Sequence, residues 1–320
     1  MHTITRRSFI QRLAVGGAAG VTASLLARGA ASAAPHRRFT MALECGAIGV
    51  SAKQAEALQM AARHGFEAVA PSTGELAAMS DSELDELAAR LKQAGLVWGA
   101  AGLNVDFRKD EATFRNGLQQ LPAAAKALAR VGATRVGTWL RPAHDTLTYM
   151  ANLRQHRIRL REIAAVLGEH QLRFGLEYVG PKTSWTAGRF PFVHTLTEAL
   201  ELIAEIGQAN VGLVLDSWHW YTAHESREDL LHLKNDNIVA CDLNDAPAGI
   251  AIDEQLDGRR ELPASTGVID LRAFLGTLVE IGYDGPVRAE PFNQALRALE
   301  NDAALATTAA AMKKALALVD

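Results

Sequence analysis

The feature that most constrains the fold of this chain is a regular alternation of short apolar runs with longer amphipathic ones, beginning at Phe39. The short runs are bounded by turn residues, which is typical of buried strands. The longer runs begin near Ser, Thr or Asp and end just before Gly, as capped helices do. Eight runs of the strand type are present, over residues 39–47, 66–72, 96–103, 133–140, 172–179, 210–218, 237–244 and 285–292.

Alternating strands and helices predict an α/β protein whose parallel sheet is covered by helices. Eight such units with no linker-like change of composition predict one domain, a single (β/α)8 TIM barrel, a fold that ordinarily occupies about 250 residues. A doubly wound open sheet is the alternative. It is less favoured because no Gly-rich phosphate-binding loop follows the first predicted strand.

Residues 1–34 have the composition of an export signal. Arg6 and Arg7 precede an Ala/Gly/Leu stretch, and the small residues 31–33 form a cleavage pattern. We therefore predict a twin-arginine signal peptide over 1–34, a barrel domain over 35–320 and a periplasmic or extracellular location. An amphipathic N-terminal helix is the alternative, weakened by its glycines. The apolar stretch is shorter than the roughly 20 residues that span a bilayer, so no stable membrane insertion is expected.

The charge of the mature domain argues against nucleic acid as a partner. The formal charge of the chain is −3, and removal of residues 1–34 takes away four arginines and no acidic residue, which makes it −7. Phosphate backbones are bound by basic surfaces, so a small molecule is the expected partner, and a homo-oligomer is left open. Cys45 and Cys241 lie in strand-like runs without zinc-site spacing, which predicts two buried thiols rather than a disulfide.

Acidic residues follow the apolar runs of the fifth to eighth predicted strands. Glu177 ends LRFGLE, Asp216 ends NVGLVLD, Asp242 lies in IVACDLN and Glu290 lies in PVRAEPF. Because strand ends meet at one face of a barrel, four carboxylates are expected to converge there. Each one alone is consistent with a helix cap or an arginine partner, and it is their occurrence on consecutive strands that indicates a shared site.

Four buried carboxylates repel one another and would largely protonate without a compensating charge. A divalent cation removes this conflict, so we predict one metal ion held by Glu177, Asp216, Asp242 and Glu290. An oxygen-rich set favours Mn²⁺ or Mg²⁺, with Co²⁺ or Fe²⁺ as alternatives, and excludes a thiolate zinc site. His219, three residues after Asp216, is a candidate ligand, orienting residue or substrate contact.

Five segments, LEYVGP, VLDSWH, CDLNDAPAG, GRRELPASTGVIDLRAFL and GYDGPVRAEPF, carry a resemblance to a known family. Over essentially the whole mature chain the sequence resembles the xylose isomerase-like barrels, the sugar phosphate isomerases and epimerases. The resemblance implies a Glu, an Asp, a His and a Glu on strands five to eight around one divalent metal. Glu177 and Glu290 are then ligands and the catalytic acid and base, Asp216 is a ligand, and His219 contacts the substrate.

The chain departs from the family pattern at Asp242, where many members have a histidine two residues before an Asn-Asp pair. An aspartate still binds metals, and it makes the site harder and more anionic. The substitution also raises the alternative of a member with altered or lost activity. Asn244 and Asp245 are close enough in sequence to compete with Asp242.

Six residues are candidates for substrate binding at the barrel mouth, namely His219, Arg259, His144, Arg141, Trp218 and Lys182. The family often uses an arginine from the arm after the seventh strand on a substrate oxygen, and the sequence leaves open whether Arg259 or Arg260 is that residue. The aromatic candidate would stack on a sugar ring. A packing or solvent-exposed role is the alternative for each.

These residues together predict a divalent-metal-dependent isomerase or epimerase that acts on a carbohydrate or keto-sugar through an enediolate. A glutamate on either face of the substrate would move the proton while the metal stabilises the negative charge. Elimination shares this first step, and export argues for an extracellular sugar, so a lyase or hydratase of oxidised 3-keto glycosides is an alternative. A non-catalytic sugar-binding barrel is another, prompted by Asp242. The acidic charge disfavours a DNA-repair endonuclease of this fold.

Overall fold

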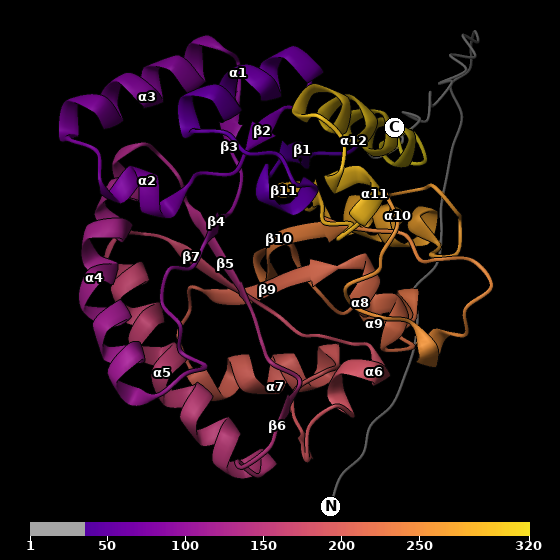
Figure 1. Ribbon diagram of the computed structural model, residues 1–320. Coiled ribbons are helices and arrows are strands. Elements are labelled where there is room, and N and C mark those ends of the chain that lie inside the picture. The colour runs from indigo at the N-terminus through magenta and orange to yellow at the C-terminus, as the bar shows by residue number, and fades with distance from the viewer. Residues whose placement is uncertain (1–35) are drawn as a thin grey trace, which may run out of the picture. The chain divides into compact units, whose positions relative to one another are not determined.

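The computed structural model describes residues 36–320, so the signal peptide predicted over 1–34 lies outside the described residues. The described part is a TIM-barrel-like domain, with parallel strands at the centre and helices around them (Figure 1). The predicted (β/α)8 barrel is confirmed. The strands of its sheet, in the order of their pairing, are β3 (Val97–Trp98), β2 (Ala68–Val69), β1 (Thr40–Leu43), β11 (Pro286–Ala289), β10 (Ile238–Leu243), β9 (Val211–Asp216), β7 (Arg173–Glu177), β5 (Arg135–Trp139) and β4 (Ala101–Gly102).

The third predicted strand is split into β3 and β4, which stand at the two ends of this order. The N–H of Gly99 still donates to Val69 O at 2.9 Å, whereas the N–H of Leu103 donates to Gly137 O at 3.0 Å. The segment therefore pairs first with β2 and then with β5. The sheet returns to its starting strand, so the eight units predicted from the sequence appear as nine short strands.

The helices end where the sequence places their caps. Ser80 accepts a hydrogen bond from the backbone N–H of Glu83 at the start of α3, and the glycines predicted to stop helices, Gly65, Gly95, Gly132, Gly207 and Gly282, all have positive φ. The longer helices are α1 (Gln54–His64), α3 (Asp81–Gln93), α4 (Glu111–Arg130), α5 (Tyr149–Glu169), α7 (Leu196–Ile206), α10 (Leu271–Ile281) and α12 (Asn301–Leu316).

Shorter elements occupy the loops after the strands. They are η1 (Gly46–Ile48), α2 (Thr73–Ala77), α6 (Lys182–Trp185), α8 (Ser217–Thr222), α9 (Arg227–Leu230), η2 (Asn235–Asn237), η3 (Ile252–Glu254) and α11 (Gln294–Arg297). A separate antiparallel pair joins β6 (Ala143–His144) to β8 (Phe190–Pro191). η2 is the exception because it leads directly into β10, and the other short elements build the mouth of the barrel, where the strands end.

The barrel interior is closed beneath the mouth by Val214. Its Cγ2 lies where Cβ atoms added to Gly137 and Gly175 would come within 3.0 and 2.8 Å. Only glycine leaves room for this valine on β5 and β7, because real Cβ atoms do not approach so closely. The barrel interior is therefore filled by side chains directly beneath the mouth, and a site at the mouth lies on this packed layer.

Two further expectations concern the cysteines and the membrane. Cys241 is buried, Cys45 is half-buried, and both are free thiols. The predicted absence of a disulfide between them is confirmed, although only one of the two is fully buried. Among residues 36–320, none of the helices combines the length and the apolar character that crossing a bilayer requires.

Candidate metal centre

Four carboxylates meet at the carboxyl end of the barrel. Glu177 is the last residue of β7, Asp216 is the last of β9, Asp242 lies near the end of β10 and Glu290 follows β11. One oxygen from each lies within 4.8 Å of the others, and at most 14% of any of these side chains is exposed. The structure thus brings together the four acids that the strand ends predict.

The register of the sheet explains why they converge. Asp242 on β10 is level with Asp216 on β9 and with Arg288 on β11. Residues that are level in a parallel sheet point to the same side, so all three side chains enter the barrel. The Asp216 carboxylate also accepts from the N–H of Trp218 at 2.7 Å and caps α8. It is therefore both a helix cap and a member of the cluster.

Two arginines lie between the carboxylates. Arg260, which is 2% exposed, donates to Asp216 Oδ2 at 2.8 Å and to Glu290 Oε2 at 3.2 Å. Arg288 donates to the two oxygens of Asp242 at 2.6 and 2.9 Å and to Glu290 Oε1 at 3.1 Å. Each oxygen of Glu290 is thus held by a different guanidinium.

Sequence reasoning missed Arg288 and left Arg260 open against Arg259. The signal for Arg288 was present in VRAEPF, since the strand period of two places it on the same face as Glu290. No such signal separates Arg259 from Arg260 in a loop. The structure places Arg260 in the cluster, whereas Arg259 is exposed and lies outside it.

Glu177 is the member of the cluster without an arginine partner. Its Oε1 is buried and has no hydrogen-bond partner among residues 36–320. Burial, together with the neighbouring charges, Glu290 first, raises the pKa of Glu177 well above its usual range. Two guanidiniums do not neutralise four carboxylates, and an unpartnered buried oxygen is costly. A divalent cation would satisfy both, so these residues fit the predicted metal.

Burial perturbs two other acids in the same direction. It raises the pKa of Asp216 to about 6, although Arg260 opposes the change. Burial and then the charge of Asp242 raise the pKa of Glu290 to about 8, against the effect of the two arginines. Without a cation, protonated carboxyl groups are therefore favoured in this cluster near neutral pH.

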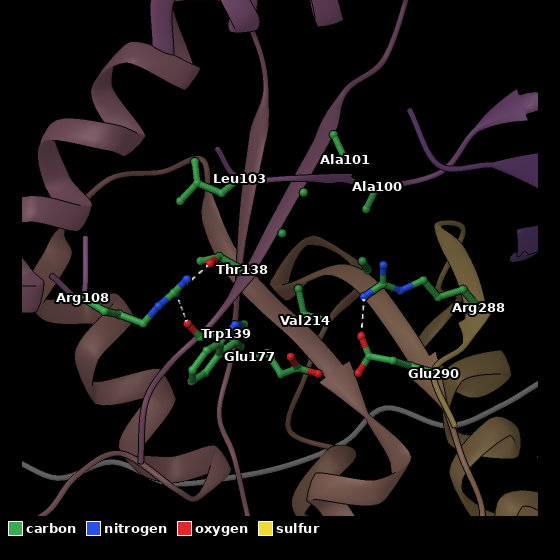
Figure 2. A pocket seen from close by; sticks show the side chains of 13 residues that line it. Ala100, Ala101, Leu103, Arg108, Thr138, Trp139, Glu177, Val214, Arg288 and Glu290 are labelled. Atoms are coloured by element: carbon green, nitrogen blue, oxygen red, sulfur yellow. Dashed lines mark hydrogen bonds and ion pairs between the residues drawn. The ribbon is translucent and has the colours of Figure 1, made fainter. Parts of the chain in front are cut away.

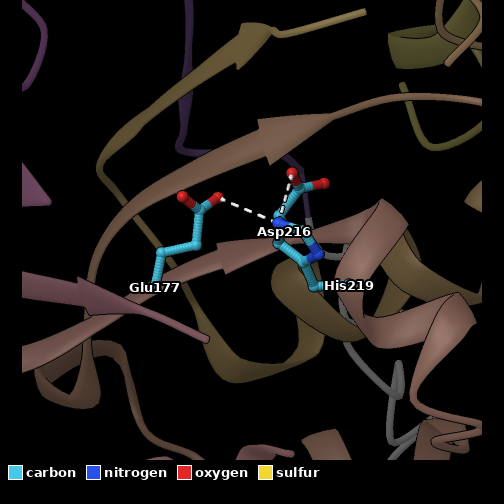
Figure 3. Close-up of side chains that lie close together, drawn as sticks. All are labelled: Glu177, Asp216 and His219. Carbon is cyan, nitrogen blue, oxygen red and sulfur yellow. Dashed lines mark ion pairs between the residues drawn. The ribbon is translucent and has the colours of Figure 1, made fainter. Parts of the chain in front are cut away.

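His219 faces the cluster from α8. The N–H of Gly180 lies 3.2 Å from Nδ1, and Nε2 lies 3.8 Å from both Glu177 Oε1 and Asp216 Oδ2 (Figure 3). Burial and then Arg260 lower the pKa of His219 to about 3, so the ring is neutral. Its geometry places it near enough to Glu177 and Asp216 to share an ion.

The contact with Gly180 decides the tautomer of His219. A neutral imidazole accepts at one nitrogen only, and Nδ1 accepts the backbone N–H. Arg260 Nη2 lies 3.4 Å from Nε2, a longer contact, and is engaged by Asp257 at 2.8 Å. Nε2 therefore carries the proton. Of the three roles that the sequence left open, this geometry favours contact with a substrate oxygen over metal ligation, because Nε2 faces the cluster and would have to lose its proton to bind an ion.

The two residues that competed with Asp242 support the cluster instead. Asn244 Nδ2 donates to both oxygens of Asp216, at 2.9 and 3.1 Å. Asp245 accepts from the backbone N–H groups of Thr266, Gly267 and Ile269 at 2.7 to 3.0 Å. This carboxylate fixes the arm that carries Arg260, and it does not face the four acids.

Three expected substrate contacts lie away from the cluster. Lys182 pairs with Asp253 at 2.7 Å on the surface. His144 Nδ1 accepts from the backbone N–H groups of residues 146 and 147, and Arg141 is exposed. None of the three lines the cavities at the carboxylates. Sequence proximity to a strand end did not determine where these loop side chains point.

Trp218 requires a correction. Its indole is fully buried, and the guanidinium of Arg260 lies 5.5 Å from the ring centroid. A side chain in this position has no surface with which to contact a sugar. The α8 turn directs the indole into the core, where it packs against the guanidinium of Arg260. The exposed indole at the mouth is that of Trp139, which sequence reasoning did not single out.

Two cavities meet at the carboxylates. One of about 220 Å³ is lined by Glu177, Glu290, Arg288, Arg108 and Trp139 among others (Figure 2). A second of about 400 Å³ is lined by Glu177, Glu290 and Trp139 as well, and by His219, Arg260 and Phe292. In Figure 2 the carboxylates of Glu177 and Glu290 point towards each other. A ligand in either cavity would reach both glutamates.

The sequence of residues 58–315 matches the family described as xylose isomerase-like TIM barrel. The chain belongs to this family. The resemblance inferred from five short segments is thereby confirmed over most of the barrel. In TIM-barrel enzymes the active site lies at the carboxyl ends of the strands, and the carboxylate cluster of this chain lies at that end.

Two curated relatives match about half of the chain. A 3-dehydroshikimate dehydratase of Pseudomonas aeruginosa is 35% identical over 158 residues, which are 49% of this chain and 23% of that protein. An inosose isomerase of Bacillus subtilis is 31% identical over 152 residues, 46% of this chain and 50% of that protein. The matched part of the chain thus spans half or less of these relatives. Both relatives are named as enzymes.

Two solved structures share the fold. A xylose isomerase domain protein from Alicyclobacillus acidocaldarius has a TM-score of 0.77 and 30% identity, covering 88% of this chain and 99% of that one. The IOLI protein, solved with a bound zinc atom, has a TM-score of 0.73 at 21% identity and the same coverage. The zinc atom of that protein shows that a chain of this fold can hold a divalent metal.

Proposed function

We propose that the protein is a divalent-metal-dependent isomerase or epimerase that acts on a keto-sugar through an enediolate. The observation that carries this proposal is the pair of buried glutamates, Glu177 and Glu290, that face each other at the end of a cavity. One oxygen of Glu177 is buried and has no hydrogen-bond partner within residues 36–320, and a cation would supply that partner. The relative named inosose isomerase supports a cyclic polyol ketone as the substrate class.

Glu177, Asp216, Asp242 and Glu290 would hold the metal, with Mn²⁺ or Mg²⁺ as the ions that suit carboxylate oxygens and Co²⁺ or Fe²⁺ as alternatives. When bound, such an ion supplies Lewis-acid polarisation of a carbonyl group. The zinc atom in a protein of the same fold supports a divalent ion without deciding its identity.

The glutamates differ in how firmly they are held. Glu290 is fixed by an arginine on each oxygen, whereas Glu177 is bound by neither. In the proposed reaction one glutamate takes the proton next to the carbonyl and the other returns one, which gives isomerisation or epimerisation. His219 Nε2–H and Arg260 donate to the oxygens that gain negative charge.

Elimination is the second candidate reaction. It begins with the same proton abstraction and ends with loss of a hydroxyl group or of a glycosyl oxygen next to the carbanion. The similarity to a 3-dehydroshikimate dehydratase favours it. A lyase or hydratase of 3-keto glycosides is the form of this reaction that fits an exported protein, and the twin-arginine signal over 1–34 remains part of the proposal.

Exchange of substrate hydrogen with D₂O tests the shared first step. The mature protein loaded with Mn²⁺ should catalyse deuterium incorporation next to the carbonyl of 2-keto-myo-inositol or D-fructose, followed by NMR. Chelation should abolish the exchange, and Mn²⁺ should restore it. Exchange with a new ketose or epimer would support isomerisation, and a dehydrated product would support elimination. Metal and sugar binding without exchange would support a non-catalytic sugar-binding barrel.

A further inference from the structure

Arg288, which pairs with Asp242, is the charged side chain of the cluster to which the proposed reaction gives no role. Asp242 is fully buried, and its two oxygens accept from two different nitrogens of Arg288, Nε at 2.6 Å and Nη2 at 2.9 Å. The residues are level on neighbouring strands, so the sheet itself builds the contact. A two-point pair of this kind fixes the plane of a guanidinium as well as its position.

This arrangement leaves one end of Arg288 available. Asp242 and Glu290 engage Nε and Nη2, whereas Nη1 has no hydrogen-bond partner in the part of the chain that the structure describes. In Figure 2 one terminal nitrogen is joined to Glu290, and the other points away from it, towards the side where Ala100 lies. Arg288 is 25% exposed there.

Arg288 borders two cavities. Arg288, Ala100 and Gly102 line both the cavity of about 220 Å³ at the glutamates and a neighbouring one of about 470 Å³. A ligand that reaches Glu177 and extends past Ala100 would therefore pass Nη1. Two N–H groups on a nitrogen without a partner are strong donors for a ligand oxygen.

The arginines that line the cavity of about 220 Å³ are already engaged by carboxylates and backbone or hydroxyl oxygens. Arg288 contacts two carboxylates, and the other guanidinium of the cavity, Arg108, donates to Trp139 O and Thr138 Oγ1 and lies 3.6 Å from Asp106. In the cluster four carboxylates face two arginines, an excess that one divalent cation would cancel. An anionic group brought beside Glu177 and Glu290 would be repelled without compensation, whereas a neutral oxygen would only gain a hydrogen bond.

We propose that Arg288, oriented by Asp242, binds a hydroxyl or carbonyl oxygen of the substrate through Nη1, and that this wall selects an uncharged keto-sugar over one that carries a carboxylate or phosphate there. The inference rests on the proposed function. Asp242 is then a positioning residue that acts through Arg288. A neutral histidine in its place offers a single acceptor nitrogen, which cannot hold a guanidinium at two points.

The test uses Arg288→Ala and Arg288→Gln in the mature protein, with Arg90→Ala on the exposed face of α3 as the matched control. Mn²⁺ binding is measured by titration calorimetry, and deuterium exchange gives KM and kcat for 2-keto-myo-inositol, D-fructose and 3-dehydroshikimate. Both Arg288 variants should still bind about one Mn²⁺ per chain, which also shows that they are folded. KM for the neutral ketones should rise roughly 10- to 100-fold, the loss expected for one charge-assisted hydrogen bond.

Chemical rescue separates direct contact from a structural effect. Guanidinium chloride at millimolar concentration should lower the raised KM of Arg288→Ala and leave the control unchanged. Asp242→Asn, assayed at saturating Mn²⁺ because Asp242 is also a proposed metal ligand, should raise KM more than it lowers kcat, because the guanidinium stays but loses its fixed plane. Either an unchanged KM in Arg288→Ala or a raised KM that guanidinium does not lower would overturn the role of Arg288.

Deuterium exchange by the wild-type protein distinguishes failure of substrate selection by Arg288 from failure of the proposed function. Faster exchange into 3-dehydroshikimate than into either neutral ketone by the wild type would overturn the selection of uncharged substrates and leave the enolisation intact. Exchange into none of the three by Mn²⁺-loaded wild type would overturn the proposed function, and the inference with it.

Discussion

The two halves of the barrel mouth differ in what they present to a ligand. The strands of the second half, β7, β9, β10 and β11, have four to six residues each, and their ends carry the four carboxylates and Arg288. In the first half, β2, β3 and β4 have two residues each. The cavity wall there consists mainly of small or apolar residues, Ala100, Ala101, Gly102 and Leu103. The chemistry is confined to one wall, and the opposite wall sets the shape of the space.

Burial explains why the acids stand on the longer strands. Every residue of β9 and β10 is buried, so a side chain at the end of either strand has little freedom to move. Groups that must lie within a few ångström of one another are held best by such rigid elements. The connecting segments of the other half line the cavity of about 220 Å³ mainly with small or apolar side chains, and Arg108 is the charged side chain among them.

Of the predicted effects, the largest is the loss of kcat on substitution of Glu177. Replacing Glu177 with Gln keeps the shape of the side chain and removes its proton chemistry, so kcat for deuterium exchange should fall by about 10²- to 10⁴-fold. Thr138→Val, on a strand of the first half and in the same cavity, should lower kcat less than tenfold. Equal losses in the two variants would show that the second half has no special role.

Metal binding should depend on Asp216 in the same way. Asp216→Asn should weaken Mn²⁺ binding by about 100-fold or more, since loss of even a supporting residue at a metal site typically costs 10- to 100-fold. Calorimetric titration of the chelator-treated protein measures this, with Asp253→Asn on the surface as the control. Full Mn²⁺ affinity in the Asp216 variant would remove this residue from the ligand set.

The stability of the metal-free protein should fall as the pH rises from about 5 to 8. The pKa of Asp216 is raised to about 6 and that of Glu290 to about 8 in the folded state, so the folded state binds protons more tightly than the unfolded one. Their contribution is therefore complete below the ordinary carboxyl pKa and is lost as the pH passes the raised values. The urea midpoint of chelator-treated protein at the two pH values measures the loss.

Two comparisons check the origin of that pH dependence. The Glu290→Gln variant should lose less stability over the same pH range, because one titrating group is gone. Saturating Mn²⁺ should reverse the trend, because the ion binds deprotonated carboxylates. A midpoint of the metal-free wild type that increases with pH would contradict the assignment.

The smallest effect is expected on the wall of the first half. Ala100→Leu adds volume to a residue that borders two cavities, so KM for a keto-sugar should rise a few-fold to tenfold while kcat changes little. Steady-state exchange kinetics give both constants. A fall in kcat as large as that of Glu177→Gln would mean that this wall takes part in the chemistry.

The residues themselves show how far a sequence predicts such a site. Glu177, Asp216, Asp242 and Glu290 could be found because strands bring their ends to one face, whatever the loops do. Lys182 could not be placed, since it lies in the loop after β7, where no period fixes the direction of a side chain. Prediction held for the acids at the strand ends, and it failed for loop side chains such as Lys182 and for Trp218 on the short helix α8.

By itself the sequence determined the number of βα units, their helix caps and the four acids at the strand ends, because these follow from local periodicity and cap chemistry. The tertiary structure decided the partners. The register of β9, β10 and β11 set Asp242 beside Arg288, and the arm after β10 brought Arg260 rather than Arg259 between the carboxylates. Such pairings depend on how distant segments pack and on which charges burial brings together, and no local pattern in the chain encodes them.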